Sequence, residues 1–254
     1  MTWGGLVGPL RAFELTVTPS RLDLVIGPGE VQEGAIQVGG RFDRPTRVRL
    51  RVGDWEMDQE GQLIFDQPGR NPRSLAKWLY VAPVEFVLGK DRVQTVRYRL
   101  QVPAEITGGY WGALFVETVP EAPELGGEAN VGIGISARLA VLIYAETKRG
   151  SARDGRVSEV RARWADGCLY MEADFVNLGN TLARLKGRFE VRNPVANKVV
   201  AKVPFEDLPV LPGMSRRIKA EWKRGLAPGS YLVVAIVDFG GRNLVAGQKM
   251  VKVG

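Results

Sequence analysis

Three acidic side chains at alternate positions have the spacing best suited to metal chemistry. Asp54, Glu56 and Asp58 share one face if this segment forms a strand, because strand side chains alternate between two faces. Carboxylate oxygens gathered in this way could bind a hard cation. The triplet equally fits a solvated strand edge that leads into the turn Gln59-Glu60-Gly61. We favour the solvated edge, and we expect no metal site and no other cofactor.

The chain contains no histidine and a single cysteine, Cys168. These counts exclude Ser-His-Asp and Cys-His catalysis, zinc sites built from His and Cys, and any intrachain disulfide. Cys168 follows Ala165-Asp166-Gly167 at the start of a predicted strand, where a buried inert thiol is the simpler interpretation and a reactive thiol the alternative. No pair of carboxylates across a cleft is indicated, as a glycosidase requires. We therefore expect no enzymatic activity. A carbohydrate-active or metal-dependent enzyme is kept as a hypothesis beside the two non-enzymatic ones given below.

Two other features have the composition of ligand sites. The glycine-rich stretch VGIGIS at 131–136 does not predict a phosphate site, because position 137 is Ala and the G-x-G-x-x-G spacing is absent. Tryptophans could line a carbohydrate surface, but they are more often core or packing residues, which is what we expect here. The six tryptophans are Trp3, Trp55, Trp78, Trp111, Trp164 and Trp222.

The elements that position these residues are predicted to be strands throughout. Short runs of Val, Leu, Ile and aromatic residues are separated by Gly, Pro, Asn and Asp, which is typical of an all-β fold. Residues 74–81 fit either a strand or a short helical turn. The expected strands lie near 13–17, 21–26, 31–38, 46–55, 62–66, 84–88, 93–101, 109–119, 131–145, 157–164, 168–176, 184–192, 198–203, 215–222, 230–237 and 244–253.

A polar, charged segment at 147–155, TKRGSARDG, is the best linker candidate. It divides the chain into an N-terminal domain over 1–147 and a C-terminal domain over 148–254. Seven short strands in about 100 residues match the size of an immunoglobulin-like sandwich. The first half fits the same plan with extra strands. The sequence therefore predicts an all-β protein of two tandem immunoglobulin-like β-sandwiches.

The longest alternating pattern is VGIGISARLAVLIYA at 131–145, where every odd position is apolar. A strand of this length exceeds the usual five or six residues, so it is expected to extend beyond its neighbours and to offer an edge for pairing. The alternative is a fully paired and buried last strand of the first domain. The apolar side chains expected to face a partner are Val131, Ile133, Ile135, Leu139 and Val141.

The net charge of +7 is concentrated in the second half. Residues 151–254 hold 18 Lys and Arg against 10 Asp and Glu, whereas residues 1–150 hold 17 against 18. A basic domain could contact nucleic acid, an anionic polymer or an anionic membrane surface. No run of five basic residues occurs. Solubility is therefore the simpler interpretation of these charges, and we expect no nucleic-acid partner.

The sequence gives two indications about location. No stretch approaches the roughly 18 consecutive apolar residues of a transmembrane helix, so no transmembrane segment is expected. The start carries Gly4, Gly5, Gly8 and Pro9 where a signal peptide needs an unbroken apolar core. We expect a chain that is either cytoplasmic or supplied without its signal.

Several segments of the first half resemble the first domain of periplasmic pilus-assembly chaperones. They are LTVTPSRLDLVIGPGE at 15–30, Ser74, Trp78 and Pro83 in SLAKWLYVAPVEFVL, the VRYRLQVP strand ending at Pro103, and GGYWGALFVE ending at Glu117. The resemblance implies that 131–145 is the strand that pairs with a partner subunit. The second half is similar to the C-terminal domains of tandem-immunoglobulin surface proteins related to WxL-interacting proteins. The segments that carry this similarity are Asn177-Leu-Gly-Asn180, LPGMSRR at 211–217 and APGSYLVVAIVDFGG at 227–241.

The chain departs from the pilus chaperones at one position. The resemblance implies a basic pair that holds a subunit's C-terminal carboxylate, with one residue on an early strand and one on the pairing strand. The matching position on the pairing strand is Val141, which cannot bind a carboxylate. The nearest basic residues are Arg138 and, on the early strand, Arg21, and these are the candidate carboxylate anchors.

Two functions follow from these observations. The leading hypothesis is a non-catalytic bacterial extracytoplasmic binding or assembly protein, periplasmic or at the cell surface, that adds a protein partner's strand along 131–145. Main-chain hydrogen bonds then supply affinity, and pockets for alternate side chains supply specificity. The alternative is a structural or adhesive surface protein whose basic second domain contacts an anionic surface polymer or protein.

Overall fold

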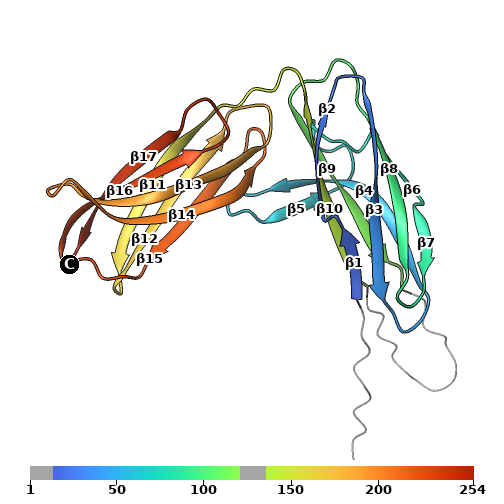
Figure 1. Ribbon diagram of the computed structural model, residues 1–254, viewed down its shortest axis with the longest axis horizontal. Coiled ribbons are helices and arrows are strands. Elements are labelled where there is room, and N and C mark those ends of the chain that lie inside the picture. Colours follow the sequence, from blue (N-terminus) through green and yellow to red (C-terminus); the bar gives the residue numbers. More distant parts are fainter. Residues whose placement is uncertain (1–13, 121–135) are drawn as a thin grey trace, which may run out of the picture.

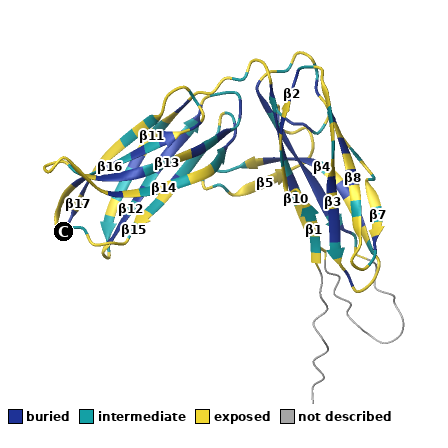
Figure 2. Cartoon of the chain, viewed as in Figure 1, coloured by how far each residue is buried: buried dark blue, intermediate teal, exposed yellow. Residues whose placement is uncertain are grey.

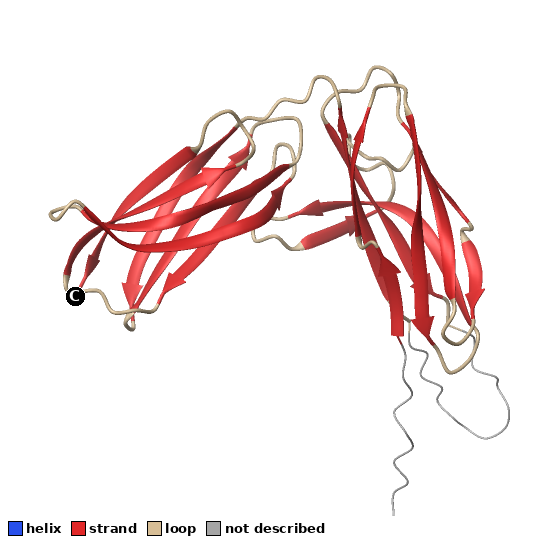
Figure 3. Ribbon diagram, viewed as in Figure 1, coloured by secondary structure: helices blue, strands red, loops and turns tan. Residues whose placement is uncertain are grey.

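The computed structural model describes residues 14–120 and 136–254, and all regular elements in these ranges are strands, as the sequence predicts (Figure 3). No helix that could cross a membrane occurs in these two ranges. The strands are β1 (Glu14–Thr18), β2 (Arg21–Ile26), β3 (Val31–Arg41), β4 (Thr46–Met57), β5 (Leu63–Asp66), β6 (Leu79–Ala82), β7 (Glu85–Leu88), β8 (Val93–Gln101), β9 (Gly109–Thr118), β10 (Arg138–Thr147), β11 (Gly155–Ala165), β12 (Cys168–Asn177), β13 (Ala183–Asn193), β14 (Lys198–Val210), β15 (Ser215–Trp222), β16 (Gly229–Asp238) and β17 (Val245–Val253).

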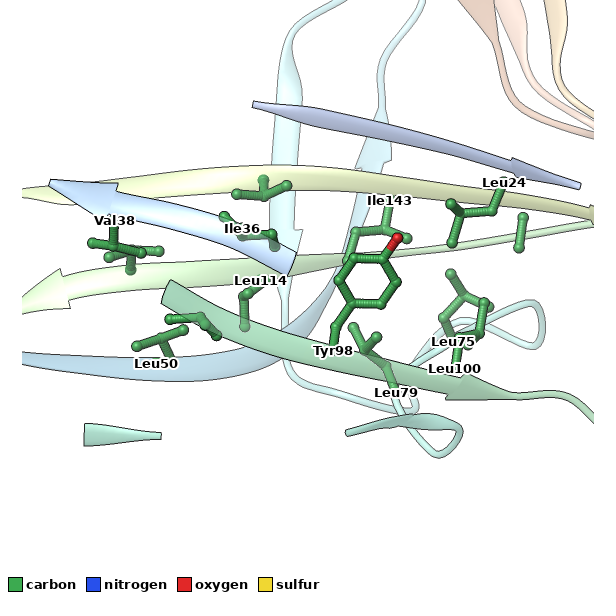
Figure 4. Packing of buried hydrophobic residues seen from close by; sticks show 14 of the residues in the cluster. Leu24, Ile36, Val38, Leu50, Leu75, Leu79, Tyr98, Leu100, Leu114 and Ile143 are labelled. Atoms are coloured by element: carbon green, nitrogen blue, oxygen red, sulfur yellow. The ribbon is translucent and has the colours of Figure 1, made fainter. Parts of the chain in front are cut away.

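Strands β1 to β10 form the first sandwich. One sheet has the strand order β1-β3-β8-β6, and we call it the β8 sheet. The other has the order β2-β10-β9-β4-β5, with β7 also paired to β4, and we call it the β9 sheet. Apolar side chains at alternate positions of facing strands fill the space between them. Ile36, Leu100, Leu114 and Ile143 are among these buried residues (Figure 4).

Strands β11 to β17 form the second sandwich, with sheets β11-β12-β15 and β14-β13-β16-β17. Its core gathers around Phe175 and Phe189. Asp166 and Gly167 join β11 to β12 with positive φ angles of 52° and 73°, the conformation of a two-residue hairpin turn. Cys168, directly after this turn, is a buried free cysteine, as the simpler interpretation expected.

The long alternating strand begins later than the sequence predicts. Strand β10 starts at Arg138 rather than at 131, and residues 131–135 lie outside the described ranges. Its neighbour β9 ends at Thr118, whose N–H donates to the carbonyl of Ala137. Pro120 then has no N–H to donate. Within the described residues, the β9–β10 pairing therefore begins at Arg138 and Glu117.

The two sandwiches meet at an elbow, where the outer face of the β9 sheet approaches the second domain (Figures 1 and 2). Apolar side chains from both domains form a third cluster there, which includes Trp55, Trp111, Phe115 and Tyr144 from the first domain and Leu211 from the second. The described tryptophans are core or packing residues, as expected: Trp55 and Trp111 are buried, while Trp78, Trp164 and Trp222 pack against the two main cores.

The motif Asn177-Leu-Gly-Asn180 forms the joint at this elbow. The buried Asn177 carboxamide donates to the carbonyls of Thr181 (2.9 Å) and Val210 (2.8 Å). The Asn180 carbonyl accepts the N–H of Gly109 in the first domain at 2.7 Å. This loop, whose one apolar side chain, Leu178, is exposed, thus connects β9 to the second sandwich.

We expect Asn177→Ala to lower the free energy of unfolding of the second domain by about 2–4 kcal/mol, because two buried carbonyls lose their donor. Urea denaturation followed by tryptophan fluorescence measures this loss. Asn193→Ala is the matched control, since the Asn193 carboxamide oxygen accepts only from Val195 and Ala196 in an exposed hairpin. Equal losses in the two variants would show that the joint adds no particular stability.

Candidate partner-binding edge

Strand β10 has one end that is paired on a single side. It pairs with β9 from Arg138 to Glu146, but with β2 only from Leu142 onward. The Leu142 N–H donates to the Ser20 carbonyl at 3.2 Å, and strand alternation places the backbone groups of Arg138 and Ala140 on this same side. Within the described ranges, no strand pairs with them there. We call residues Arg138–Val141 the open edge.

The predicted partner-facing side chains have different surroundings. Leu139 is 36% exposed at the open edge. Val141 is fully buried in the core of its own domain, so its side chain packs against the sandwich rather than facing a partner. Val131, Ile133 and Ile135 lie outside the described residues, and their role stays a prediction.

Arg138 lies at the open edge, on the outer face of the β9 sheet. Its Nε is 2.9 Å from a carboxylate oxygen of Glu117 on β9. Its guanidinium carbon lies 3.9 Å from the centroid of the Phe115 ring, within the range of a cation–π contact. The side chain is therefore oriented by two neighbours and still half exposed.

Arg21, the other candidate anchor, lies farther along β10. It stands opposite Leu142 in the parallel β2–β10 pair, four residues from Arg138 along the strand, or about 13 Å. Its guanidinium already contacts Asp23 (3.0 Å) and Asp207 (3.4 Å). The structure does not bring the two arginines together.

Arg184 of the second domain links the two domains beside Arg21. It contacts Asp23 of β2 at 2.7 Å and Asp207 of β14 at 3.0 Å, and its guanidinium lies 5.3 Å from the centroid of the Tyr144 ring. Burial pushes the pKa of Asp207 upward, but hydrogen bonds and charge from Arg184 and Arg21 outweigh this and hold it below its ordinary value. Burial raises the pKa of Tyr144 to about 12, so this phenol stays neutral.

The β4–β5 hairpin forms a second link across the elbow. Glu60 at its tip contacts Arg217 (2.8 Å) and Lys219 of β15. The Gln59 carbonyl accepts the N–H of Arg217 at 2.7 Å, so the hairpin also bonds to the backbone of this edge strand. The hydrogen bond from Lys219 lowers the pKa of Glu60.

A cavity of about 360 Å³ lies at the elbow, within the size range of small-molecule sites. Its charged lining is largely paired: Arg184 with Asp23, and Arg153 with Glu146 at 2.7 Å. The guanidinium groups in this cavity are therefore already engaged by carboxylates of the protein itself.

The acidic triplet does not gather into a cation site. Asp54 is buried and accepts hydrogen bonds from the Asn71 N–H (3.0 Å) and the Ser74 hydroxyl. Glu56 is exposed, and Asp58 accepts a backbone N–H inside the hairpin turn. Among the described residues, no group of three or more His, Cys, Asp or Glu side chains could hold a metal ion.

The basic second domain pairs many of its arginines internally. Arg161 and Arg217 both contact Asp174, and Arg188 and Arg192 both contact Glu190. The basic side chains of this domain are therefore interspersed with carboxylates. These contacts offer no support for an anionic polymer as a partner.

Sequence reasoning missed the residues that fix the elbow. Arg184 and Asp23 are 161 positions apart, and Arg217 and Glu60 are 157 apart, so no local pattern connects them. It also missed Phe115, whose segment GYWGALFVET lacks polar alternation. A continuous apolar run indicates a strand buried on both faces. The sequence of this segment therefore already indicates that its outer face is covered.

We expect the elbow to loosen in acid. Because the pKa values of Glu60 and Asp207 are lowered from 4.5 and 3.8, their stabilising contribution is complete above these values and is lost as the pH falls through the lowered ones. Small-angle scattering should show a larger radius of gyration at about pH 2 than at about pH 5. Glu60→Gln/Asp207→Asn should already be expanded at neutral pH. An unchanged radius, with circular dichroism confirming folded sheets, would contradict this role.

Neither a protein-family model nor a curated protein matches the chain. Among solved structures, a chain from a chaperone–tip adhesin complex of CFA/I fimbriae aligns over 94% of this chain and 99% of its own, with 15% identity and a TM-score of 0.49. The class 5 fimbriae chaperone CfaA aligns over 92% and 98%, with 13% identity and a TM-score of 0.49. The E. coli chaperone DraB aligns over 95% and 98%, with 17% identity and a TM-score of 0.43.

Proposed function

We propose that this is a non-catalytic assembly or binding protein that adds an extended strand of a protein partner to its open edge. The observation that carries the proposal is the pairing of β10, which has β9 on one side of Arg138–Val141 and no described strand on the other. Unpaired strand edges are templates for pairing with another chain. At four residues, the open edge is short enough to limit indiscriminate pairing.

The open edge offers both elements of strand recognition. The backbone groups of Arg138 and Ala140 supply hydrogen bonds, and the exposed part of Leu139 supplies an apolar contact. Leu15 and Val17 of β1 are half-buried where the two sheets meet along this side of the core. An apolar side chain of the partner strand would extend this core.

The polar groups near the open edge suit recognition rather than catalysis. The whole chain lacks histidine, and Arg138 contacts a carboxylate that holds it in place. A carboxylate on the partner would meet Arg138, whereas Arg21 lies beside the part of β10 that β2 covers. We place this activity in the periplasm or at the cell surface, in keeping with the sequence resemblance.

Ala140→Pro tests strand addition directly, because it removes the N–H that faces the open edge and leaves the bonds to β9 in place. The probe is a fluorescein-labelled nine-residue peptide in which Val alternates with Ser, measured by fluorescence anisotropy. We expect Ala140→Pro to bind it about tenfold more weakly, and Ala140→Ser, which keeps the N–H, to bind it like the parent. Equal binding by both variants, at equal thermal stability, would refute strand addition at this edge.

Hydrogen exchange gives a second measurement. The amides of Arg138 and Ala140 should exchange quickly in the free protein, while that of Leu142, bonded to Ser20, should exchange slowly. The peptide should slow the first two amides and leave the third unchanged. Slow exchange of Ala140 in the free protein would mean that the edge is already covered.

A further inference from the structure

Four arginines lie on the outer face of the β9 sheet, and one of them, Arg138, belongs to the open edge. Arg47, Arg49 and Arg51 occupy alternate positions of β4, and Arg138 lies on β10. The register places Arg49 opposite Glu117 of β9, and Glu117 opposite Arg138, so these side chains share one face. We call the four arginines the arginine face.

Two carboxylates pair with these four guanidinium groups. Glu85 lies 3.6 and 3.0 Å from the first two arginines of β4, and Glu117 lies 3.6 Å from Arg51 and 2.9 Å from Arg138. The arginine face and its partners therefore carry two uncompensated positive charges. All four arginine side chains are between 45% and 61% exposed, and exposed ion pairs are weak, so another carboxylate can replace or join these partners.

A hollow of about 480 Å³ lies against this face, and Arg51 and Arg138 both line it. The Phe115 ring forms an apolar wall, with the Phe65 ring edge-on at a centroid distance of 5.2 Å. Asp66 also lines the hollow, but its side chain alternates with that of Phe65 and its carboxylate accepts a neighbouring backbone N–H. The hollow thus combines guanidinium donors with an apolar wall, as the carboxylate and methylenes of an acidic side chain require.

An added strand would bring its own side chains to this face. It would lie about 4.8 Å from β10, with directly opposed Cβ atoms about 5 Å apart. Its outward side chains would stand beside Arg138 and Ala140, and its inward ones beside Leu139. We propose that the partner strand alternates apolar inward residues with acidic outward residues, and that Arg138, together with Arg51, selects the acidic ones. This inference rests on the proposed function and specifies the chemistry of its partner.

The test compares three labelled nine-residue peptides in which Val alternates with Glu, Ser or Lys. We expect the Val–Glu peptide to bind roughly tenfold more tightly than the Val–Ser peptide, and the Val–Lys peptide to bind most weakly. Added salt should reduce the differences in affinity among the three peptides, because it screens the exposed charges of the arginine face. Arg51→Gln/Arg138→Gln should bind the three peptides with similar affinity.

A matched control separates the arginine face from the overall positive charge. Arg97→Gln/Arg99→Gln removes the same charge from exposed positions of β8, on the other sheet, and should keep the preference for Glu. Equal binding of the three peptides by the parent, or equal loss of preference in both double variants, would overturn the inference. In either case, if Ala140→Pro still weakens peptide binding, strand addition itself holds. If no peptide binds, the proposed function fails and the inference fails with it.

Discussion

The pairing of β2 with β10 starts at Leu142. This starting point determines which residues of β10 form the open edge. The chain leaves the β8 sheet at the end of β1 and enters the β9 sheet as β2, so neither strand covers the whole side of the sandwich. Ser20 supplies the first carbonyl to β10, and no described strand pairs on that side with the four residues of β10 before Leu142. Backbone donors and acceptors need a partner or water. The backbone groups of the open edge therefore need water or the partner strand that we propose.

The second domain keeps β2 in this register. Asp23 and Arg21 of β2 contact Arg184 and Asp207 across the elbow, while the alternating leucines of β2 face the core of the first domain. A shift of β2 by one residue would turn those leucines outward and break both interdomain contacts. The same elbow buries the outer face of β9 near Tyr144. The interdomain contacts thus fix how much of β10 is covered, although they lie some distance from the open edge.

Local patterns predicted most strands, because alternating apolar residues and turn residues lie within or beside each strand in the sequence. Asp166-Gly167 is a hairpin turn wherever two strands flank it, and the structure has it so. The beginning of β10 was not predictable from alternation, because it depends on where β9 ends, at Thr118. The solvated edge predicted for the acidic triplet is wrong at Asp54 for a similar reason: its carboxylate is buried and accepts hydrogen bonds from Asn71 and Ser74, which strand periodicity cannot indicate. The elbow contacts join residues more than 150 positions apart, and only the tertiary fold brings them together.

Ion pairs have two different roles in this molecule, and exposure separates them. At the elbow, the Arg184 side chain is 25% exposed, bonded to two carboxylates and placed over an aromatic ring. On the arginine face, the Arg51 side chain is 61% exposed and shares Glu117 with Arg138 at a longer distance. A partly buried, multiply bonded pair is costly to break, whereas an exposed shared pair exchanges its partners at little cost. The elbow pairs therefore hold the geometry of the open edge, and the exposed pairs beside that edge remain available to a partner.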